Sequence, residues 1–275
     1  MIKKASGELQ AFSYDKLRHS LETSGADSML ADEIVEHISS QLYEGVSTKV
    51  IHARALAMLK THQKSFAARY DLKRAVFALG PSGFPFEQYV ARLFNDMGYA
   101  TQVGVVLQGK CVTHEVDVVL KKGAVSGFAE CKFHNRPGIK CDVKTPLYVL
   151  ARFEDICERE EVSFKGNQER EGWLVTNTRF TDDALAYGSC VGLKLLGWNT
   201  GPLGESLERL IDKGGLHPIT CLTSLKIEQK RQLLAQGIVL CQELITSSNI
   251  LLPAEIIAKA VAEARELCKR PIYAK

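Results

Sequence analysis

The sequence predicts an α/β domain with a mixed sheet, set between two mainly helical regions. In the middle of the chain, a helical apolar stripe is followed by strands of alternating polarity and then by alternating helices and strands. Turn-rich breaks at residues 80–83 and 197–204 separate this segment from flanks whose apolar residues recur at helical spacing. We therefore predict three domains, over residues 1–80, 81–200 and 201–275.

The first region begins with a short hairpin around the Ser6-Gly7 turn. Ser13 is a candidate N-cap, because its side chain can accept a backbone N–H, for a helix that runs to about Ser24. Further helices are predicted over residues 31–43, from Ser47 or Thr48 onwards, and over 71–79.

The middle region is predicted to begin with a helix that has Pro85 in its first turn and ends at Gly98. The elements expected after it are strands over 100–107, 113–120 and 126–133, a helix over 142–157, a strand over 172–176, a helix over 181–188 and a strand over 193–196. This order is typical of an α/β sandwich.

The third region is predicted to contain two short helices around Gln236-Gly237 and an amphipathic helix over residues 254–267. The two short helices resemble a helix-hairpin-helix, in which backbone amides bind a DNA phosphate. Packing or dimerisation explains the same pattern, so both interpretations stay open.

Composition and charge limit the class of protein. The 275 residues carry a formal net charge of +3, which is compatible with nucleic acid but too small for binding driven by charge alone. No apolar run approaches the roughly 18 residues of a membrane span, and no apolar segment follows the basic start, so we expect a cytoplasmic protein without a membrane partner. The eight cysteines include no Cys-x-x-Cys pair, which indicates reduced thiols rather than a zinc ribbon.

Two neighbouring predicted strands carry a set of residues suited to phosphodiester hydrolysis. Residues two apart share a face of a strand, so Glu130 and Lys132 lie together, as do Glu115 and Asp117. Carboxylates such as Asp117 and Glu130 are ligands for Mg²⁺, which activates water and neutralises charge at a phosphate. Lys132 can orient the water or offset phosphate charge. The sequence therefore predicts a metal-dependent active site.

Asp117, followed after twelve residues by Glu130-Cys131-Lys132, resembles the PD-(D/E)xK nuclease superfamily, in particular the Mrr-like restriction endonucleases. The resemblance covers residues 83–198 and includes Glu87 on the preceding helix; the proline of the motif is replaced by Val116. It implies a restriction-endonuclease-like fold, Mg²⁺ or Mn²⁺ held by Glu87, Asp117 and Glu130, and an endodeoxyribonuclease of restriction or defence type.

Some of these residues have a second interpretation. Glu87 also suits the positive end of a helix dipole, and Glu115 is either a further metal-side carboxylate or, as we favour, a solvated edge residue. Lys140 and Lys144 are equally well explained as DNA backbone contacts and as a solvated surface.

Ile2-Lys3-Lys4, Phe12 and Lys16-Leu17 resemble the ATP-cone domain over residues 1–80. The resemblance implies ATP or dATP as an effector, with phosphates bound by Lys3, Lys4 and Lys16, because lysine supplies point charges for phosphate. The alternative is a helical DNA-contact or dimerisation domain.

Three functions remain open: the DNA endonuclease, a nuclease acting on RNA or branched DNA, and a non-catalytic nucleotide-sensing regulator that binds DNA. Since cleavage of both strands of a duplex commonly needs two active sites, we expect a homodimer.

Overall fold

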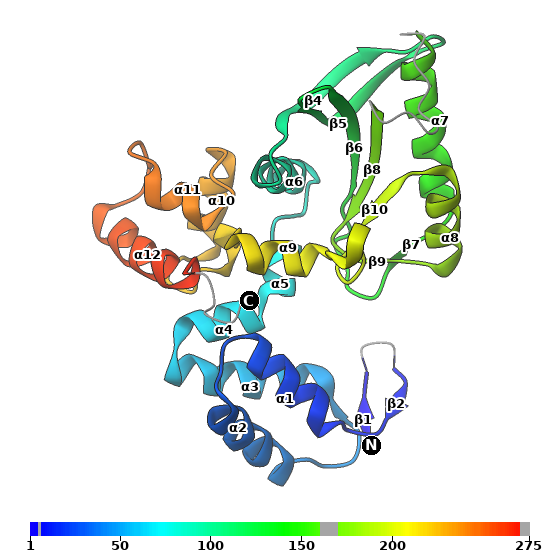
Figure 1. The fold of residues 1–275 in the computed structure, drawn as a ribbon. Helices are drawn as coiled ribbons and strands as arrows, with labels where there is room; N and C mark the ends of the chain where they lie inside the picture. The colour runs from blue at the N-terminus through cyan, green and yellow to red at the C-terminus, as the bar shows by residue number, and fades with distance from the viewer. Residues whose placement is uncertain (5–6, 160–169, 270–275) are drawn as a thin grey trace. The chain divides into compact units, whose positions relative to one another are not determined.

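The structure is a computed structural model that describes residues 1–4, 7–159 and 170–269, and the chain in it forms two compact units (Figure 1). Val76–Leu216 form one, here called the sheet unit. Met1–Ala75 and His217–Lys275 form the other, the helical unit. The division into three domains at residues 80 and 200 stays a prediction. None of the helices in the described part of the chain is long and apolar enough to cross a membrane.

The sheet unit is built on a five-stranded mixed sheet. Its strands, in spatial order, are β10 (Lys194–Leu196), β8 (Arg170–Thr176), β6 (Val125–Lys132), β5 (Thr113–Lys122) and β4 (Ala100–Gln108). Pairing is antiparallel among β4, β5 and β6 and parallel among β6, β8 and β10. A separate parallel pair joins β7 (Lys140–Cys141) to β9 (Arg179–Phe180). The α/β fold class predicted from the sequence is confirmed, and it is consistent with a restriction-endonuclease-like fold.

Helices lie on both faces of this sheet (Figure 1). They are α6 (Phe84–Asp96), α7 (Lys144–Arg159) and α8 (Asp182–Val191), followed by the 3₁₀ turn η1 (Pro202–Gly204) and α9 (Leu207–Gly214). On one face, Phe94 of α6 meets Trp173 edge-on with ring centroids 5.1 Å apart. On the other, Phe153 of α7 packs on Phe128 at 5.4 Å. The central strands β5, β6 and β8 therefore contribute buried residues between two helical layers, whereas the edge strand β4 has none.

The helical unit combines a small sheet with helices from both ends of the chain. Its strands are β1 (Ile2–Lys3), which pairs with β2 (Leu9–Gln10) and β3 (Val46–Ser47). Its helices are α1 (Tyr14–Thr23), α2 (Ser28–Ser40), α3 (Thr48–His62) and α4 (Lys64–Tyr70), then η2 (Ile219–Cys221), α10 (Ile227–Ala235), α11 (Cys241–Thr246) and α12 (Ala254–Leu267). Helix α5 (Leu72–Phe77) spans the boundary between the two units.

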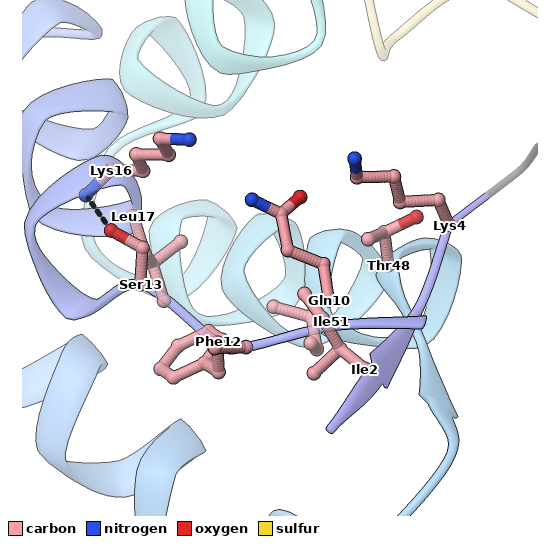
Figure 2. A pocket seen from close by; sticks show the side chains of 10 residues that line it. Ile2, Lys4, Gln10, Phe12, Ser13, Lys16, Leu17, Thr48 and Ile51 are labelled. Carbon is pink, nitrogen blue, oxygen red and sulfur yellow. Dashed lines mark hydrogen bonds between the residues drawn. The ribbon is translucent and has the colours of Figure 1, made fainter. Parts of the chain in front are cut away.

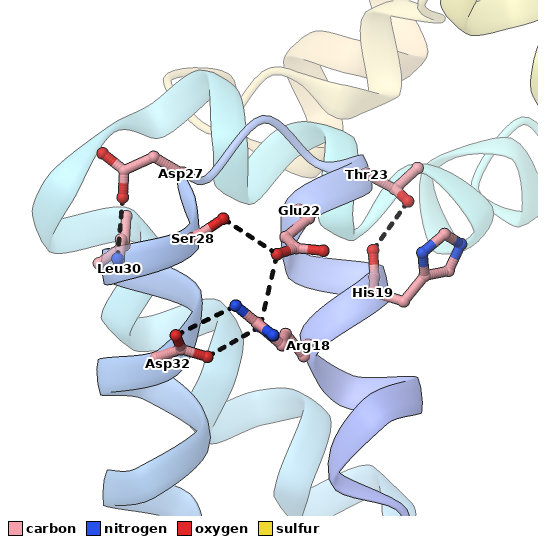
Figure 3. A network of polar contacts seen from close by, with 8 residues as sticks. All are labelled: Arg18, His19, Glu22, Thr23, Asp27, Ser28, Leu30 and Asp32. Carbon is pink, nitrogen blue, oxygen red and sulfur yellow. Dashed lines mark hydrogen bonds and ion pairs between the residues drawn. The ribbon is translucent and has the colours of Figure 1, made fainter.

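Side-chain caps define where the first helices begin. The Ser13 side chain accepts the N–H of Lys16 at 3.3 Å, as predicted, and Asp27 likewise begins α2. Helix α2 therefore begins at Ser28, three residues before the predicted start. Figure 3 shows Arg18 joining α1 to Asp32 of α2 at 2.8 Å. This exposed ion pair contributes little on its own, about 0–1 kcal/mol; the buried residues between the helices supply the core.

Candidate active site

Three acidic side chains from different elements approach one another in the sheet unit. Glu87 lies in the first turn of α6, and the antiparallel register of β5 and β6 places Asp117 opposite Glu130. Burial, and then the charges of Asp117, Glu115 and Glu130, raise the pKa of Glu87 to about 7. Each carboxylate therefore lies in the field of the others, which makes full ionisation unfavourable.

Asp117 and Glu130 are subject to opposing influences. Burial raises the pKa of Asp117, whereas the N–H of Cys131, which donates to Asp117 Oδ2 at 2.7 Å, lowers it. Burial also raises the pKa of Glu130, and the charge of Asp117 raises it further. A cation placed between such groups would relieve their repulsion.

Lys132 is exposed at the carboxyl end of β6. Its positive charge lowers the pKa of both Asp117 and Glu130, so its ammonium group lies within electrostatic range of the pair. The hydroxyl of Thr176 donates to the carbonyl of Lys132 at 2.8 Å, which fixes the backbone there. The structure thus brings together the four residues proposed from the sequence for catalysis, including Glu87.

The chain that leaves β6 is also held in place. Asn177 accepts the N–H of His134 at 2.8 Å and donates its amide to the carbonyl of His134 at 2.9 Å. This two-point contact between β8 and the turn after β6 limits the freedom of Lys132, two residues earlier. Asn177 directly follows β8, and no pattern in the sequence predicts a positioning role for it.

Arg152 of α7 belongs to the same cluster and was not predicted. Its Nη1 donates to Glu130 Oε2 at 2.5 Å, and its Nη2 donates to the backbone carbonyl of Glu115. The Arg152 and Glu130 side chains are only 12% and 18% exposed. The sequence holds one indication of this position: Arg152 lies between Val149 and Phe153, which are on the buried side of α7.

The cluster has the ligand types for a hard cation. Carboxylate oxygens are the preferred ligands of Mg²⁺ and Mn²⁺, and Glu87, Asp117 and Glu130 supply them. Among the described residues, however, no set of three or more His, Cys, Asp or Glu side chains is spaced to hold a metal ion. The guanidinium of Arg152 neutralises the charge of Glu130 in this arrangement.

A second candidate site lies in the helical unit, at the small sheet (Figure 2). It is a cavity of about 230 Å³ lined by Ile2, Lys4, Gln10, Ala11, Phe12, Ser13, Lys16, Leu17, Thr48 and Ile51. Lys4 and Lys16, both proposed from the sequence, lie at its rim, and Lys4 pairs with Glu8 at 3.1 Å. Lys3 does not line the cavity, because neighbouring residues of a strand point to opposite faces.

The family description AF1548-like, C-terminal, matches residues 217–268. An uncharacterized protein of Archaeoglobus fulgidus is 36% identical over 183 residues, which span 65% of this chain and 99% of that protein. The crystal structure of AF1548, a protein of unknown function, matches with a TM-score of 0.57 and 33% identity, covering 68% of this chain and 98% of that chain.

A more distant structural match is the MspJI restriction endonuclease in complex with a 27-mer oligonucleotide. Its TM-score is 0.37 and its identity 17%, covering 70% of this chain and 39% of that chain.

Proposed function

This chain belongs to the AF1548-like family, and we propose that it is a metal-dependent nuclease that hydrolyses phosphodiester bonds in DNA, of restriction or defence type. One observation carries the proposal: three partly buried carboxyl groups, those of Glu87, Asp117 and Glu130, gather beside Lys132. A cluster of mutually repelling carboxylates is unfavourable for a purely structural role, and perturbed groups of this kind concentrate at functional sites.

In this proposal, Glu87, Asp117 and Glu130 hold Mg²⁺ or Mn²⁺. The bound cation supplies an activated water and neutralises negative charge at the scissile phosphate. Lys132 orients that water and offsets charge on the phosphate through its ammonium group. When no metal ion is bound, Arg152 neutralises the charge of Glu130 and so stabilises the folded state.

Cleavage assays with the full chain test the proposal and the class of substrate. Plasmid DNA, linear duplex DNA, branched DNA and RNA are incubated with Mg²⁺, with Mn²⁺ and with a chelator. We expect duplex DNA to be cut with either cation and not with the chelator. Cleavage of RNA or branched DNA alone would replace the substrate in the proposal. Absence of cleavage of every substrate by the folded protein would contradict the nuclease and favour the non-catalytic regulator.

A second function is proposed for the cavity at the small sheet, namely binding of ATP or dATP as an effector. Lys4 and Lys16 at one cavity rim favour it, since two ammonium groups can contact a triphosphate. A fluorescent ATP analogue should bind wild type and bind Lys16→Ala about 10-fold more weakly, the loss of one charged contact. Lys49→Ala, which changes an exposed lysine outside the cavity, is the matched control. Equal affinity of all three proteins would refute this assignment.

Cleavage of both strands of a duplex is most simply achieved by two active sites, so we also propose a homodimer. Light scattering on the purified chain, with and without DNA, tests it. A monomer in both conditions would contradict it.

A further inference from the structure

Two cysteines of the helical unit lie against each other at the ends of adjacent helices. Cys241 is the first residue of α11 and is fully buried, with its Sγ 3.4 Å from the carbonyl oxygen of Pro218. Cys268 ends α12 and is partly exposed. The Cys241 and Cys268 side chains share a hydrogen bond, and the helices that carry them, α11 and α12, pack against each other. One thiol is therefore accessible and the other sits directly behind it.

Arg69 of α4 lies beside the accessible thiol. Its Nη2 donates to the carbonyl of Leu267 at 3.1 Å and to that of Lys269 at 2.8 Å, the residues on either side of Cys268. The guanidinium thus covers the end of α12 and adds positive charge where a thiolate would form.

These contacts shift the pKa values of the two thiols in opposite directions. The hydrogen bond from Cys241 lowers the pKa of Cys268 well below its ordinary value, against the effect of burial, and His217 and the charge of Arg69 lower it further. Burial raises the pKa of Cys241. An accessible thiolate beside a buried protonated thiol is the arrangement of a reactive cysteine with its resolving partner.

We propose that Cys268 and Cys241 form an oxidisable dithiol site, in which Cys268 is oxidised by a hydroperoxide and Cys241 completes an intramolecular disulfide. This dithiol site lies in the helical unit alone and does not depend on the nuclease activity.

Both steps use only the two thiols, the hydroperoxide and solvent water. The Cys268 thiolate attacks one oxygen of the hydroperoxide, the O–O bond breaks, and Cys268 becomes a sulfenic acid while the alkoxide or hydroxide leaves and takes a proton from water. The Cys241 thiol then attacks the Cys268 sulfur, the S–O bond breaks, and one water leaves with the proton of Cys241. The sulfur atoms together lose two electrons, which the peroxide accepts.

Other cysteines of the chain provide an internal comparison. Cys111 and Cys190 are exposed, more so than Cys268. The carboxylate of Asp155 accepts a hydrogen bond from the Cys111 thiol and raises its pKa. If exposure alone governed oxidation, Cys111 and Cys190 would react first; if thiolate character governs it, Cys268 reacts first.

The test treats the full chain with hydrogen peroxide near neutral pH, blocks remaining thiols with an alkylating agent, and maps cysteine-containing peptides by mass spectrometry over time. We expect a Cys241–Cys268 disulfide to form at least about 10-fold faster than Cys111 or Cys190 is oxidised, a rate ratio set by the thiolate fractions. In Cys241→Ser, sulfenic acid should accumulate at Cys268 and be trapped by dimedone. In Cys268→Ser, neither product should form.

Cys190→Ser is the control that should behave as wild type, and circular dichroism shows whether each variant folds. Faster oxidation of Cys111 or Cys190 than of Cys268 would overturn the proposal. So would a folded Cys241→Ser protein that yields no trapped sulfenic acid. A stoichiometric zinc ion in the purified chain, lost in Cys268→Ser, would also overturn it in favour of a metal site; among the described residues these side chains are not spaced as one.

Discussion

Replacement of Glu87 by glutamine removes one carboxylate from the acidic cluster while keeping the size of the side chain. In the folded, metal-free chain, burial and the charges of Asp117 and its neighbours raise the pKa of Glu87 from 4.5 to about 7. The folded state then binds the proton more tightly than the unfolded state. Stability must therefore fall as pH rises from the unfolded pKa to the folded one, and the penalty is complete above about pH 7. Glu87→Gln should lose this penalty.

The size of this stability penalty follows from the shift in the pKa of Glu87. A change of about 2.5 pKa units at about 1.36 kcal/mol per unit gives about 3.4 kcal/mol as an upper limit. Glu87 is only half-buried, so water screens its interactions, and we expect a gain of about 1–2 kcal/mol in the unfolding free energy at about pH 8. Below about pH 4.5, where the carboxyl group is protonated in both states, the gain should vanish.

Urea unfolding in the presence of a chelator, at about pH 8 and about pH 4, measures this difference. Asp183→Asn is the matched control, because it also removes an acidic group from the first turn of a helix of the sheet unit and lies outside the cluster. Added Mg²⁺ should stabilise wild type but not Glu87→Gln, since binding to the folded state shifts the equilibrium. If Glu87→Gln is no more stable than wild type at the higher pH, the mutual repulsion inferred for the cluster is absent.

Three further outcomes are expected. Arg152→Ala leaves Glu130 without its cationic partner and should lower the unfolding free energy by about 1–3 kcal/mol in chelator. The loss should be smaller in excess Mg²⁺. Urea titrations in both buffers check this, and an equal loss in both would contradict it. The hydrogen bond from His114 lowers the pKa of Asp155. The stability that Asp155 contributes should therefore be present above its ordinary pKa of 3.8 and lost only at more acid pH. An acid unfolding curve unchanged by Asp155→Asn would refute this. Glu263 accepts two backbone N–H groups from the loop before α10, so Glu263→Ala should destabilise the helical unit by about 2–3 kcal/mol, measured by urea unfolding and refuted by a change within error.

Local patterns predict most elements of the sheet unit. Polarity alternation over residues 113–120 and 126–133 predicts β5 and β6, which extend over Thr113–Lys122 and Val125–Lys132. The same alternation predicts that Glu130 and Lys132 share a face. These predictions succeed because side-chain direction in a strand depends on the backbone alone.

Features that depend on tertiary contact were not predictable in the same way. Arg152 reaches Glu130 from a separate helix, so no fixed spacing in the sequence indicates the pair. Helix α4 follows α3 without a turn signal, and no cap side chain marks its start. Lys3 follows Ile2 in the two-residue strand β1 and therefore lies on the face opposite to Ile2, which lines the cavity. A phosphate-binding role for Lys3 stays a prediction.

In the C-terminal part, the turn predicted at Gln236-Gly237 does separate two short helices, α10 and α11. Gly237 has a φ of +76°, a conformation that favours glycine there. A phosphate-binding role for this turn stays a prediction.

The most direct test of the nuclease is the initial rate of supercoiled plasmid cleavage with Mg²⁺ by wild type, Lys132→Ala and Lys121→Ala. Both substitutions remove an exposed lysine from the same sheet, but only Lys132 adjoins the carboxylates. We predict a rate about 100-fold or more below wild type for Lys132→Ala and an unchanged rate for Lys121→Ala, with no cleavage by any of them in chelator. Equal rates for wild type and Lys132→Ala, or cleavage that persists in chelator, would contradict the assignment of this site.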